Sequence, residues 1–439
     1  MTKLRTCGSL TFAQEPSRKE SSLGKFSLPA MICIIVLFVA AVVIASPAQN
    51  VVFTTLWSFS AGGDGANPGY ESLIRGTDGN FYGTTSLGGN LGCNNGAGCG
   101  TVFKMTPSGT LTTLYSFQGQ SDGAFPEAGL LQATDGSLYG TTSWGGLNGS
   151  AYYGTVFKIT PAGTLTTLYS FCSQHFCTDG RTPMAPLVHG ADGNFYGTTT
   201  AGGTGCDGWG CGTFFKITPA GALTTLYSFC TQPNCSDGND PSGTLVQIAN
   251  GDFYGTTSLN GTVFKVTPNG VLTTLYSFCA QPPNCPDGYY PYSGLVQASD
   301  GNFYGTTSSG GANGGGTVFR ITSTGALTTL HNFEGYPMDG FQPYAGLVQA
   351  SDGNFYGTTY NGGAGNNCNN GCGTVFKMTP SGTLTTLHSF DGTDGTLPYG
   401  GLVQAPDGFF YGTTNAGGSY GYGTVFRVGV ARSCATCRR

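Results

Sequence analysis

The chain has 439 residues and a formal net charge of −5, and only 9% of its residues are charged whereas 13% are aromatic. So few lysines and arginines offer no basic patch for phosphate groups, which argues against nucleic acid as a partner. The 75 glycines alone would suit a disordered chain, but the aromatic residues recur in register and supply apolar surface to bury, so we expect a folded protein.

The first predicted element is an apolar segment at residues 28–45. It follows the basic residues Arg18, Lys19 and Lys25 and precedes Ser46-Pro47-Ala48, an order typical of a signal peptide cleaved after Ala48. The alternative is that residues 1–48 remain as an N-terminal membrane anchor, because 28–45 is close to the length needed to span a bilayer. Either interpretation predicts an exported protein, located outside the cell, on its surface or in the periplasm, with membrane contact only through 28–45.

Residues 51–428 consist of seven copies of one unit, each marked by the tetrad Tyr-Gly-Thr-Thr. The tetrads begin at Tyr82, Tyr139, Tyr196, Tyr254, Tyr304, Tyr356 and Tyr411. Each unit contains four short segments rich in Val, Thr, Phe and Tyr and bounded by Gly, Asp and Pro, which predicts four strands. In one copy these strands cover 294–298, 302–307, 316–321 and 326–333. Tight turns join the first strand to the second and the third to the fourth, as in one blade of a propeller.

The order of the strands predicts how the repeat closes. Residues 53–59 have the sequence of a fourth strand although no unit precedes them, and the last unit ends after its third strand, at 423–428. A ring can use the first strand to complete the last blade, beside 402–428, whereas an open solenoid would gain nothing from this offset. We therefore predict an all-β, seven-bladed β-propeller at 51–428, monomeric, with a short tail at 429–439.

In such a ring the long connections lie on one side, which we call the loop face. It receives the second-to-third-strand loops and the loops between blades, and most of the cysteines fall there in local couples. The couples are Cys93 with Cys99, Cys172 with Cys177, Cys206 with Cys211, Cys230 with Cys235, Cys279 with Cys285, Cys368 with Cys372 and, in the tail, Cys434 with Cys437. Such close spacing in exported loops predicts disulfides. Zinc is the alternative, but it would need four thiolates at one point, and most couples lie in different repeats.

Every loop between blades contains the motif Asp-Gly-x-x-Pro. Its aspartates are Asp64, Asp122, Asp179, Asp237, Asp287, Asp339 and Asp394. Seven carboxylates on one face are a possible ring of ligands for a cation such as calcium, the only cofactor that the sequence suggests. The alternative is that each aspartate accepts hydrogen bonds from the backbone of its own turn.

A few loop residues depart from the repeat consensus and are candidates for binding. They are Trp144, Arg181, Asp207, Trp209, Asp240, Tyr289 and Tyr290. Aromatic side chains among Asp, Asn and Gly are suited to stack on and hydrogen-bond sugar rings, and the alternative is that they pack over neighbouring loops. The four histidines form neither a Ser-His-Asp order nor a clustered metal signature, so the sequence identifies no catalytic residue.

The repeated string Gly-Leu-Val-Gln-Ala-x-Asp-Gly-Asn-Phe-Tyr-Gly-Thr-Thr, followed by Gly-Thr-Val-Phe-Lys-Ile-Thr-Pro, resembles the GloVer tandem repeat of bacterial "choice-of-anchor" surface proteins over about residues 51–428. The resemblance implies export, often with a C-terminal surface anchor, and no established activity. Residues 429–439 depart from that pattern because they contain no apolar span. The strand order is also similar to that of NHL-type propellers, as a fold analogy only.

The leading hypothesis is a non-enzymatic, exported binding or adhesion module that recognises a glycan or an extracellular protein through its disulfide-stiffened loop face. A second hypothesis is a polysaccharide hydrolase or lyase in which loop carboxylates such as Asp207 and Asp240 share acid and base roles. A third is a purely structural envelope protein.

Overall fold

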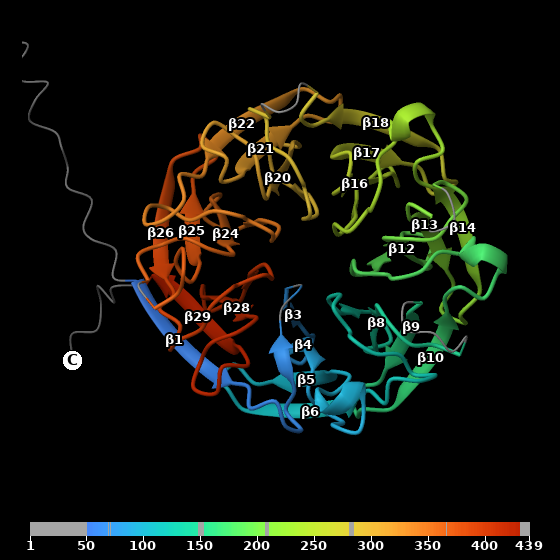
Figure 1. Cartoon of the computed structure of the whole chain (residues 1–439), viewed down its shortest axis with the longest axis horizontal. Coiled ribbons are helices and arrows are strands. Elements are labelled where there is room, and N and C mark those ends of the chain that lie inside the picture. The colour runs from blue at the N-terminus through green and yellow to red at the C-terminus, as the bar shows by residue number, and fades with distance from the viewer. Residues whose placement is uncertain are drawn as a thin grey trace, which may run out of the picture. The chain divides into compact units, whose positions relative to one another are not determined.

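The computed structural model describes residues 51–68, 70, 72–147, 153–206, 210–280, 285–365 and 367–430. These residues form seven small antiparallel sheets arranged as a ring, the architecture of a seven-bladed β-propeller (Figure 1). The predicted all-β fold is therefore confirmed. The N-terminal segment 28–45 lies outside the described residues. Within the described ranges, no helix is long and apolar enough to cross a bilayer.

Each blade has four strands, numbered here from the innermost outwards. In blades 1 to 4 they are β3 (Ile74–Arg75), β4 (Phe81–Leu87), β5 (Thr101–Met105) and β6 (Leu111–Ser116); β7 (Leu131–Gln132), β8 (Leu138–Thr142), β9 (Thr155–Ile159) and β10 (Leu165–Ser170); β11 (Val188–His189), β12 (Phe195–Thr199), β13 (Thr213–Ile217) and β14 (Leu223–Ser228); and β15 (Val246–Gln247), β16 (Phe253–Thr257), β17 (Thr262–Val266) and β18 (Leu272–Ser277). Blade 1 also carries β2 (Ala66–Pro68), which pairs with β4.

Blades 5 to 7 follow the same plan. Their strands are β19 (Val296–Gln297), β20 (Phe303–Thr307), β21 (Thr317–Ile321) and β22 (Leu327–Asn332); β23 (Val348–Gln349), β24 (Phe355–Thr359), β25 (Thr374–Met378) and β26 (Leu384–Ser389); and β27 (Val403–Gln404), β28 (Phe410–Thr414), β29 (Thr424–Val430) and β1 (Val51–Ser58). The inner strands are shorter than predicted. The centre of the ring is crowded, and a Cβ on Gly294, for example, would overlap the backbone of Thr244.

The first strand of the chain closes the ring, as predicted. Strand β1 pairs antiparallel with β29, from Val51 opposite Val430 to Ser58 opposite Thr424. In Figure 1 the blue β1 lies beside the red β29, so the two ends of the propeller share one sheet. Because of this pairing, β29 extends to Val430, slightly beyond residue 428, where the propeller was predicted to end.

The tetrad Tyr-Gly-Thr-Thr is explained by contacts inside each blade. In blade 1, Tyr82 donates a hydrogen bond from its hydroxyl to Asp78 in the turn before β4, at 2.9 Å. A Cβ on Gly83 would come within 2.6 Å of the ring of Phe103, so only glycine fits there. The second threonine, Thr85, is buried and its hydroxyl lies 2.8 Å from that of Thr101 on β5. The tetrad therefore holds the second and third strands together.

A circle of phenylalanines joins neighbouring blades. The phenylalanine that follows each outer strand packs edge-on against the phenylalanine of the third strand in the next blade, with ring centroids 5.1–5.5 Å apart. The pairs are Phe59–Phe103, Phe117–Phe157, Phe171–Phe215, Phe229–Phe264, Phe278–Phe319, Phe333–Phe376 and Phe390–Phe426. Because all seven contacts are made, the apolar core continues around the whole ring.

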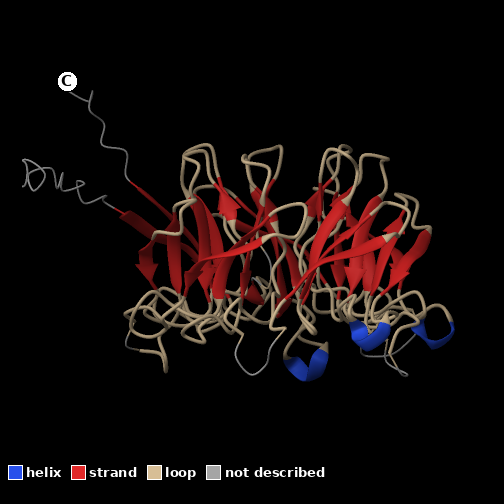
Figure 2. Ribbon diagram, turned by 90° about the horizontal axis from the view of Figure 1, so that it is seen from above, coloured by secondary structure: helices blue, strands red, loops and turns tan. Residues whose placement is uncertain are grey.

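The antiparallel strand order places the second-to-third-strand loops and the loops between blades on the same face. These loops carry three short 3-10 turns, η1 (Asn94–Gly96), η2 (His175–Cys177) and η3 (Pro233–Cys235), which all appear on the lower side of Figure 2. The loop face is thus built as the sequence indicated.

Six of the seven predicted cysteine couples are disulfides in the structure, and all six lie in the loops of this face. The bonds pair Cys93 with Cys99, Cys172 with Cys177, Cys206 with Cys211, Cys230 with Cys235, Cys279 with Cys285, and Cys368 with Cys372. The seventh couple, Cys434 with Cys437 in the tail, lies outside the described residues, so its disulfide stays a prediction.

Candidate functional site

The loops between blades share an unusual backbone conformation just before the proline of Asp-Gly-x-x-Pro. The residue before that proline lies in the left-handed region, with φ between 53° and 60°, in all seven loops: Asn67, Phe125, Thr182, Asp240, Tyr290, Gln342 and Leu397. Its carbonyl oxygen accepts a hydrogen bond from the residue after the tetrad in the next blade, for example from Ser258 N to Asp240 O at 2.9 Å. Main-chain bonds therefore hold the inner part of each loop.

The seven motif aspartates are held at the ends of the outer strands. The side chain of Asp179, for example, accepts hydrogen bonds from the Tyr169 hydroxyl at 2.8 Å and from Ser173 N at 2.9 Å. His331 and His388 take the place of that tyrosine opposite Asp339 and Asp394. Donors from the same loop thus occupy these carboxylates in each repeat. Calcium binding by the aspartates stays a prediction.

Trp144, one of the predicted binding residues, lines a cavity of about 630 Å³ on the loop face. The cavity lies between the loops of blades 1 and 2, and its wall includes the disulfide of Cys93 with Cys99. Trp144 packs edge-on against Phe125, with ring centroids 4.9 Å apart, and Gln120 supplies an amide group. A volume in this range, with aromatic walls and a few polar groups, is typical of small-ligand sites.

The other predicted residues are divided over the ring. Arg181 pairs with Ala201 through the backbone between blades 2 and 3, where burial lowers the pKa of its guanidinium. Asp240, Tyr289 and Tyr290 lie in the two loops on either side of blade 4. Asp207 and Trp209 lie outside the described residues, so the proposed acid pair of Asp207 and Asp240 has no described geometry.

Tyr289 and Tyr290 belong to a larger group of tyrosines on the loop face, which we call the tyrosine arc. Its members are Tyr70, Tyr289, Tyr290, Tyr292, Tyr344, Tyr360 and Tyr399. Their rings contact one another in series, and all are half-buried. The tightest parallel contact joins Tyr344 and Tyr399, with centroids 4.6 Å apart and planes within 5°.

Two members of the tyrosine arc, Tyr70 and Tyr344, lie near the centre of the ring. Tyr70 and Tyr344 line a cavity of about 210 Å³ together with Ser72, Thr244 and Ser293. Because these residues come from inner segments of several different blades, the cavity must lie near the propeller axis. The arc also breaks the sevenfold regularity, since positions equivalent to Tyr292, Tyr344 and Tyr399 hold other residue types in the loops before blades 2, 3 and 4, namely Glu127, Met184 and Ser242.

Two carboxylates influence the electrostatics of the arc. Burial raises the pKa of Asp240 to about 6, although Ser258 Oγ donates a hydrogen bond to its carboxylate at 2.5 Å. Burial, and then the charge of Asp240, raise the pKa of Tyr292. Burial also raises the pKa of Glu127, whose charge adds to burial in raising the pKa of Tyr70. The hydroxyl groups of Tyr70 and Tyr292 are therefore held neutral at neutral pH, and each has an acidic group beside it.

Five members of the arc were not singled out from the sequence. Tyr292, Tyr344 and Tyr399 each follow the motif proline, so a Pro-Tyr pair recurs in three consecutive loops. That repetition is the signal that would have found them. Tyr70 and Tyr360 carry no such signal, because only the closed ring brings them to the same place.

Solved structures of similar shape share the fold at low sequence identity. A catalytically inactive virginiamycin B lyase from Staphylococcus aureus with quinupristin aligns with a TM-score of 0.56 and 14% identity, over 87% of this chain and 100% of that chain. The selenomethionine-substituted form of that lyase aligns with a TM-score of 0.54 and 13% identity, over 87% of this chain and 99% of that chain. The extracellular domain of a putative hybrid two-component system from B. thetaiotaomicron aligns with a TM-score of 0.54 and 11% identity, over 86% of this chain and 39% of that chain. A search of curated protein sequences found no match.

The fold and the loops define a disulfide-bearing, seven-bladed repeat propeller. The chain belongs to the family of the Gloeobacter/Verrucomicrobia repeat, whose profile matches residues 41–261 and 258–437. The family resemblance inferred from the repeated string is thereby confirmed.

Proposed function

We propose that this protein is an exported, non-enzymatic binding module that recognises a glycan through the tyrosine arc. The observation that carries the proposal is the series of seven tyrosine rings on one part of an otherwise regular ring. Tyrosine rings offer flat apolar faces to the C–H faces of sugars, and their hydroxyl groups can hydrogen-bond sugar hydroxyls. Six disulfides in the loops of the same face support export and limit the ordering cost of binding.

The test is binding of the full chain to a glycan array and to insoluble polysaccharides, followed by calorimetry with the best oligosaccharide. The double variant Tyr344→Ala, Tyr399→Ala removes the parallel pair, and we expect affinity to fall by about tenfold or more, as for a central interface residue. Tyr420→Ala is the matched control, because Tyr420 is 63% exposed in a loop of blade 7 and outside the arc. Equal losses in both variants, or none in either, would contradict the proposal.

A second candidate function is depolymerisation of a polysaccharide, which the environment of Asp240 favours. A carboxyl group whose pKa is raised to about 6 is suited to donate a proton near neutral pH. Release of reducing ends or unsaturated sugars from a polysaccharide panel would support this function if Asp240→Asn abolishes turnover while binding persists. A chain that neither binds nor cleaves any member of either panel would favour the third hypothesis, a structural envelope protein.

A further inference from the structure

The cavity beside Trp144 continues into a second hollow on the outer side of blade 2. This hollow has a volume of about 360 Å³, and residues of β10 form one of its walls. Ser121 and Leu147 line both hollows, so the two meet and form one elongated depression, which we call the blade-2 groove. It extends from the loops between blades 1 and 2 to β10, which lies on the outer edge of the ring (Figure 1).

The walls of the blade-2 groove are held by bonds within the protein. Gly146 N donates a hydrogen bond to Gln120 O at 2.7 Å, and Leu147 N donates one to Ser170 Oγ at 3.2 Å. At the inner end, Gly119 lies directly against the disulfide of blade 1, and a Cβ at Gly119 would come within 2.6 Å of both its sulfur atoms. The groove is therefore formed before any ligand binds, which keeps the ordering cost of binding low.

The residues that line the groove define the chemistry of its ligand. Among the described residues, none of those that line either hollow is charged. Trp144 and Phe125 supply aromatic surface, Gln120 supplies an amide, and Ser173 supplies a hydroxyl group. Leu147, where the hollows meet, is 76% exposed. Such a surface suits an elongated, uncharged molecule with both apolar faces and hydroxyl groups, whereas a charged ligand would lose water and gain no partner.

An extended peptide is the other kind of ligand that a groove along an outer strand suits, because it can add to the edge of the sheet. The pairing of β10 with β9, however, is shifted by a bulge between Thr167 and Tyr169. The hydroxyl of Thr167 is also bonded to Ser121 O, at 3.2 Å. A bulge interrupts the regular row of main-chain groups that an added strand needs.

We propose that the blade-2 groove is a second glycan-binding site, which takes a neutral oligosaccharide with sugar units in both hollows. The volumes of the two hollows, about 630 and 360 Å³, lie in the range of small-ligand sites. The inference goes beyond the proposed function, because the groove and the tyrosine arc have no residue in common. Either site can therefore bind without the other.

The experiment uses the arc variant, which is the full chain with Tyr344→Ala and Tyr399→Ala, so that binding by the groove is measured alone. Calorimetry compares neutral tetrasaccharides of glucose, xylose, mannose and N-acetylglucosamine with the corresponding disaccharides. We expect at least one tetrasaccharide to bind, and to bind more tightly than its disaccharide, because only the longer chain reaches both hollows. Adding Trp144→Ala should lower the affinity by about tenfold. Adding Leu147→Asp should remove most of the difference between the two lengths.

The matched control is Val271→Asp in the arc variant. Val271 is an aliphatic residue, 64% exposed, in the turn between β17 and β18 on the opposite face. This substitution should leave the affinity for the tetrasaccharide unchanged. Circular dichroism shows that each variant is folded, and Leu147→Asp tests the groove at an exposed position where unfolding is not expected.

Hydrogen exchange provides a second measurement that needs no substitution in the groove. The bound tetrasaccharide should slow exchange in 144–147 and 167–170 of the arc variant. The proposal is overturned if these segments are not protected, if no neutral tetrasaccharide binds, or if binding survives Trp144→Ala. It is also overturned if tetragalacturonate binds as tightly as the neutral chains, or if uncharged peptides bind in place of the saccharides.

The same variants separate this inference from the proposed function of the arc. If the unmodified chain binds a glycan and the arc variant binds none, the groove proposal is wrong and the proposed function stands. If the arc variant binds as tightly as the unmodified chain and Trp144→Ala removes that binding, the groove is the glycan site and the proposed function of the arc is wrong.

Discussion

Phe59 packs edge-on against Phe103, with ring centroids 5.5 Å apart, and so joins the strand that closes blade 7 to blade 1. Phe59 directly follows β1 and is completely buried. The same contact recurs between every pair of neighbouring blades, but only at this position does it involve the strand contributed by the start of the propeller.

We expect Phe59→Ala to lower the free energy of unfolding by roughly 3–5 kcal/mol, because a fully buried aromatic ring is removed. Chemical denaturation measures the loss, and hydrogen exchange locates it. Exchange should accelerate in β1 and β29. The control is Phe278→Ala, which removes the equivalent contact with Phe319, 5.1 Å away, and should leave exchange in β1 unchanged. Equal acceleration in both variants would show that Phe59 has no special part in closure.

Asp240 should make the stability of the protein depend on pH. Below about pH 3.8 the carboxyl group is protonated in both the folded and unfolded chains. Between about pH 4 and 6 it ionises in the unfolded chain but stays protonated when folded, because burial raises its pKa to about 6. The unfolded chain then binds fewer protons than the folded chain. The free energy of unfolding therefore falls as the pH rises through this window, by about 3 kcal/mol at most.

Asp240→Asn should remove that part of the pH dependence, which urea denaturation at a series of pH values would show. Asp252→Asn is a control, since Asp252 lies in a turn on the opposite face and pairs with Lys265 at 3.7 Å. If the wild type and Asp240→Asn lose stability in parallel between about pH 4 and 6, Asp240 is not the group that titrates.

The motif aspartates should contribute to stability through hydrogen bonds and not through calcium. Asp179 is fully buried and accepts bonds from the Tyr169 hydroxyl and from both the backbone and hydroxyl of Ser173. We expect Asp179→Asn to cost about 3 kcal/mol, as for charged hydrogen bonds without a replacement, and the less buried Asp64→Asn to cost less. A chelator should leave the thermal midpoint unchanged. A midpoint that rises with added calcium would instead support the cation-binding ring.

Trp144 should contribute to binding through its own cavity. We expect Trp144→Ala to weaken the binding of neutral oligosaccharides by about tenfold, because the ring forms an aromatic wall of the cavity. Phe176→Ala is the control, since Phe176 is an aromatic residue that is 80% exposed in another loop. Calorimetry on Trp144→Ala and the arc variant together shows whether the two sites act independently. Unchanged binding in Trp144→Ala would limit recognition to the tyrosine arc.

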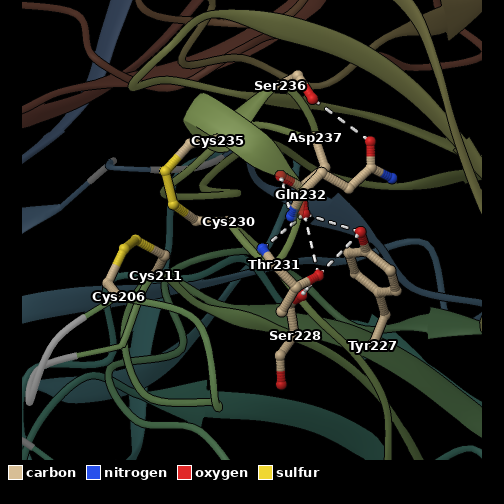
Figure 3. Close-up of a disulfide and its surroundings, with 10 residues drawn as sticks. All are labelled: Cys206, Cys211, Tyr227, Ser228, Cys230, Thr231, Gln232, Cys235, Ser236 and Asp237. Atoms are coloured by element: carbon tan, nitrogen blue, oxygen red, sulfur yellow. Dashed lines mark hydrogen bonds between the residues drawn. A yellow bond between two sulfur atoms is a disulfide. The ribbon is translucent and has the colours of Figure 1, made fainter.

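The architecture could be predicted because its determinants are local and repeated. The tetrad at Tyr82 and its six copies specify the blade, the strand at 53–59 specifies closure, and couples such as Cys279 with Cys285 are close enough in sequence to specify their disulfides. The tyrosine arc depends on long-range geometry instead. Tyr70 and Tyr399 are far apart in the sequence and meet at 5.0 Å only because the ring is closed. Likewise, the two disulfides of blade 3, Cys206–Cys211 and Cys230–Cys235, lie side by side (Figure 3) because two loops pack against each other. The spacing of cysteines in the sequence does not predict this contact.

The support of the inner loops by main-chain bonds has a consequence for how this scaffold diversifies. Because a main-chain hydrogen bond to the carbonyl of a residue such as Asp240 fixes the loop, the side chains next to it contribute little to the loop's conformation. Residues as different as Met184, Ser242 and Tyr344 accordingly occupy equivalent positions. Single substitutions at these positions can therefore change the binding specificity of the loop face while the propeller that supports it keeps its fold.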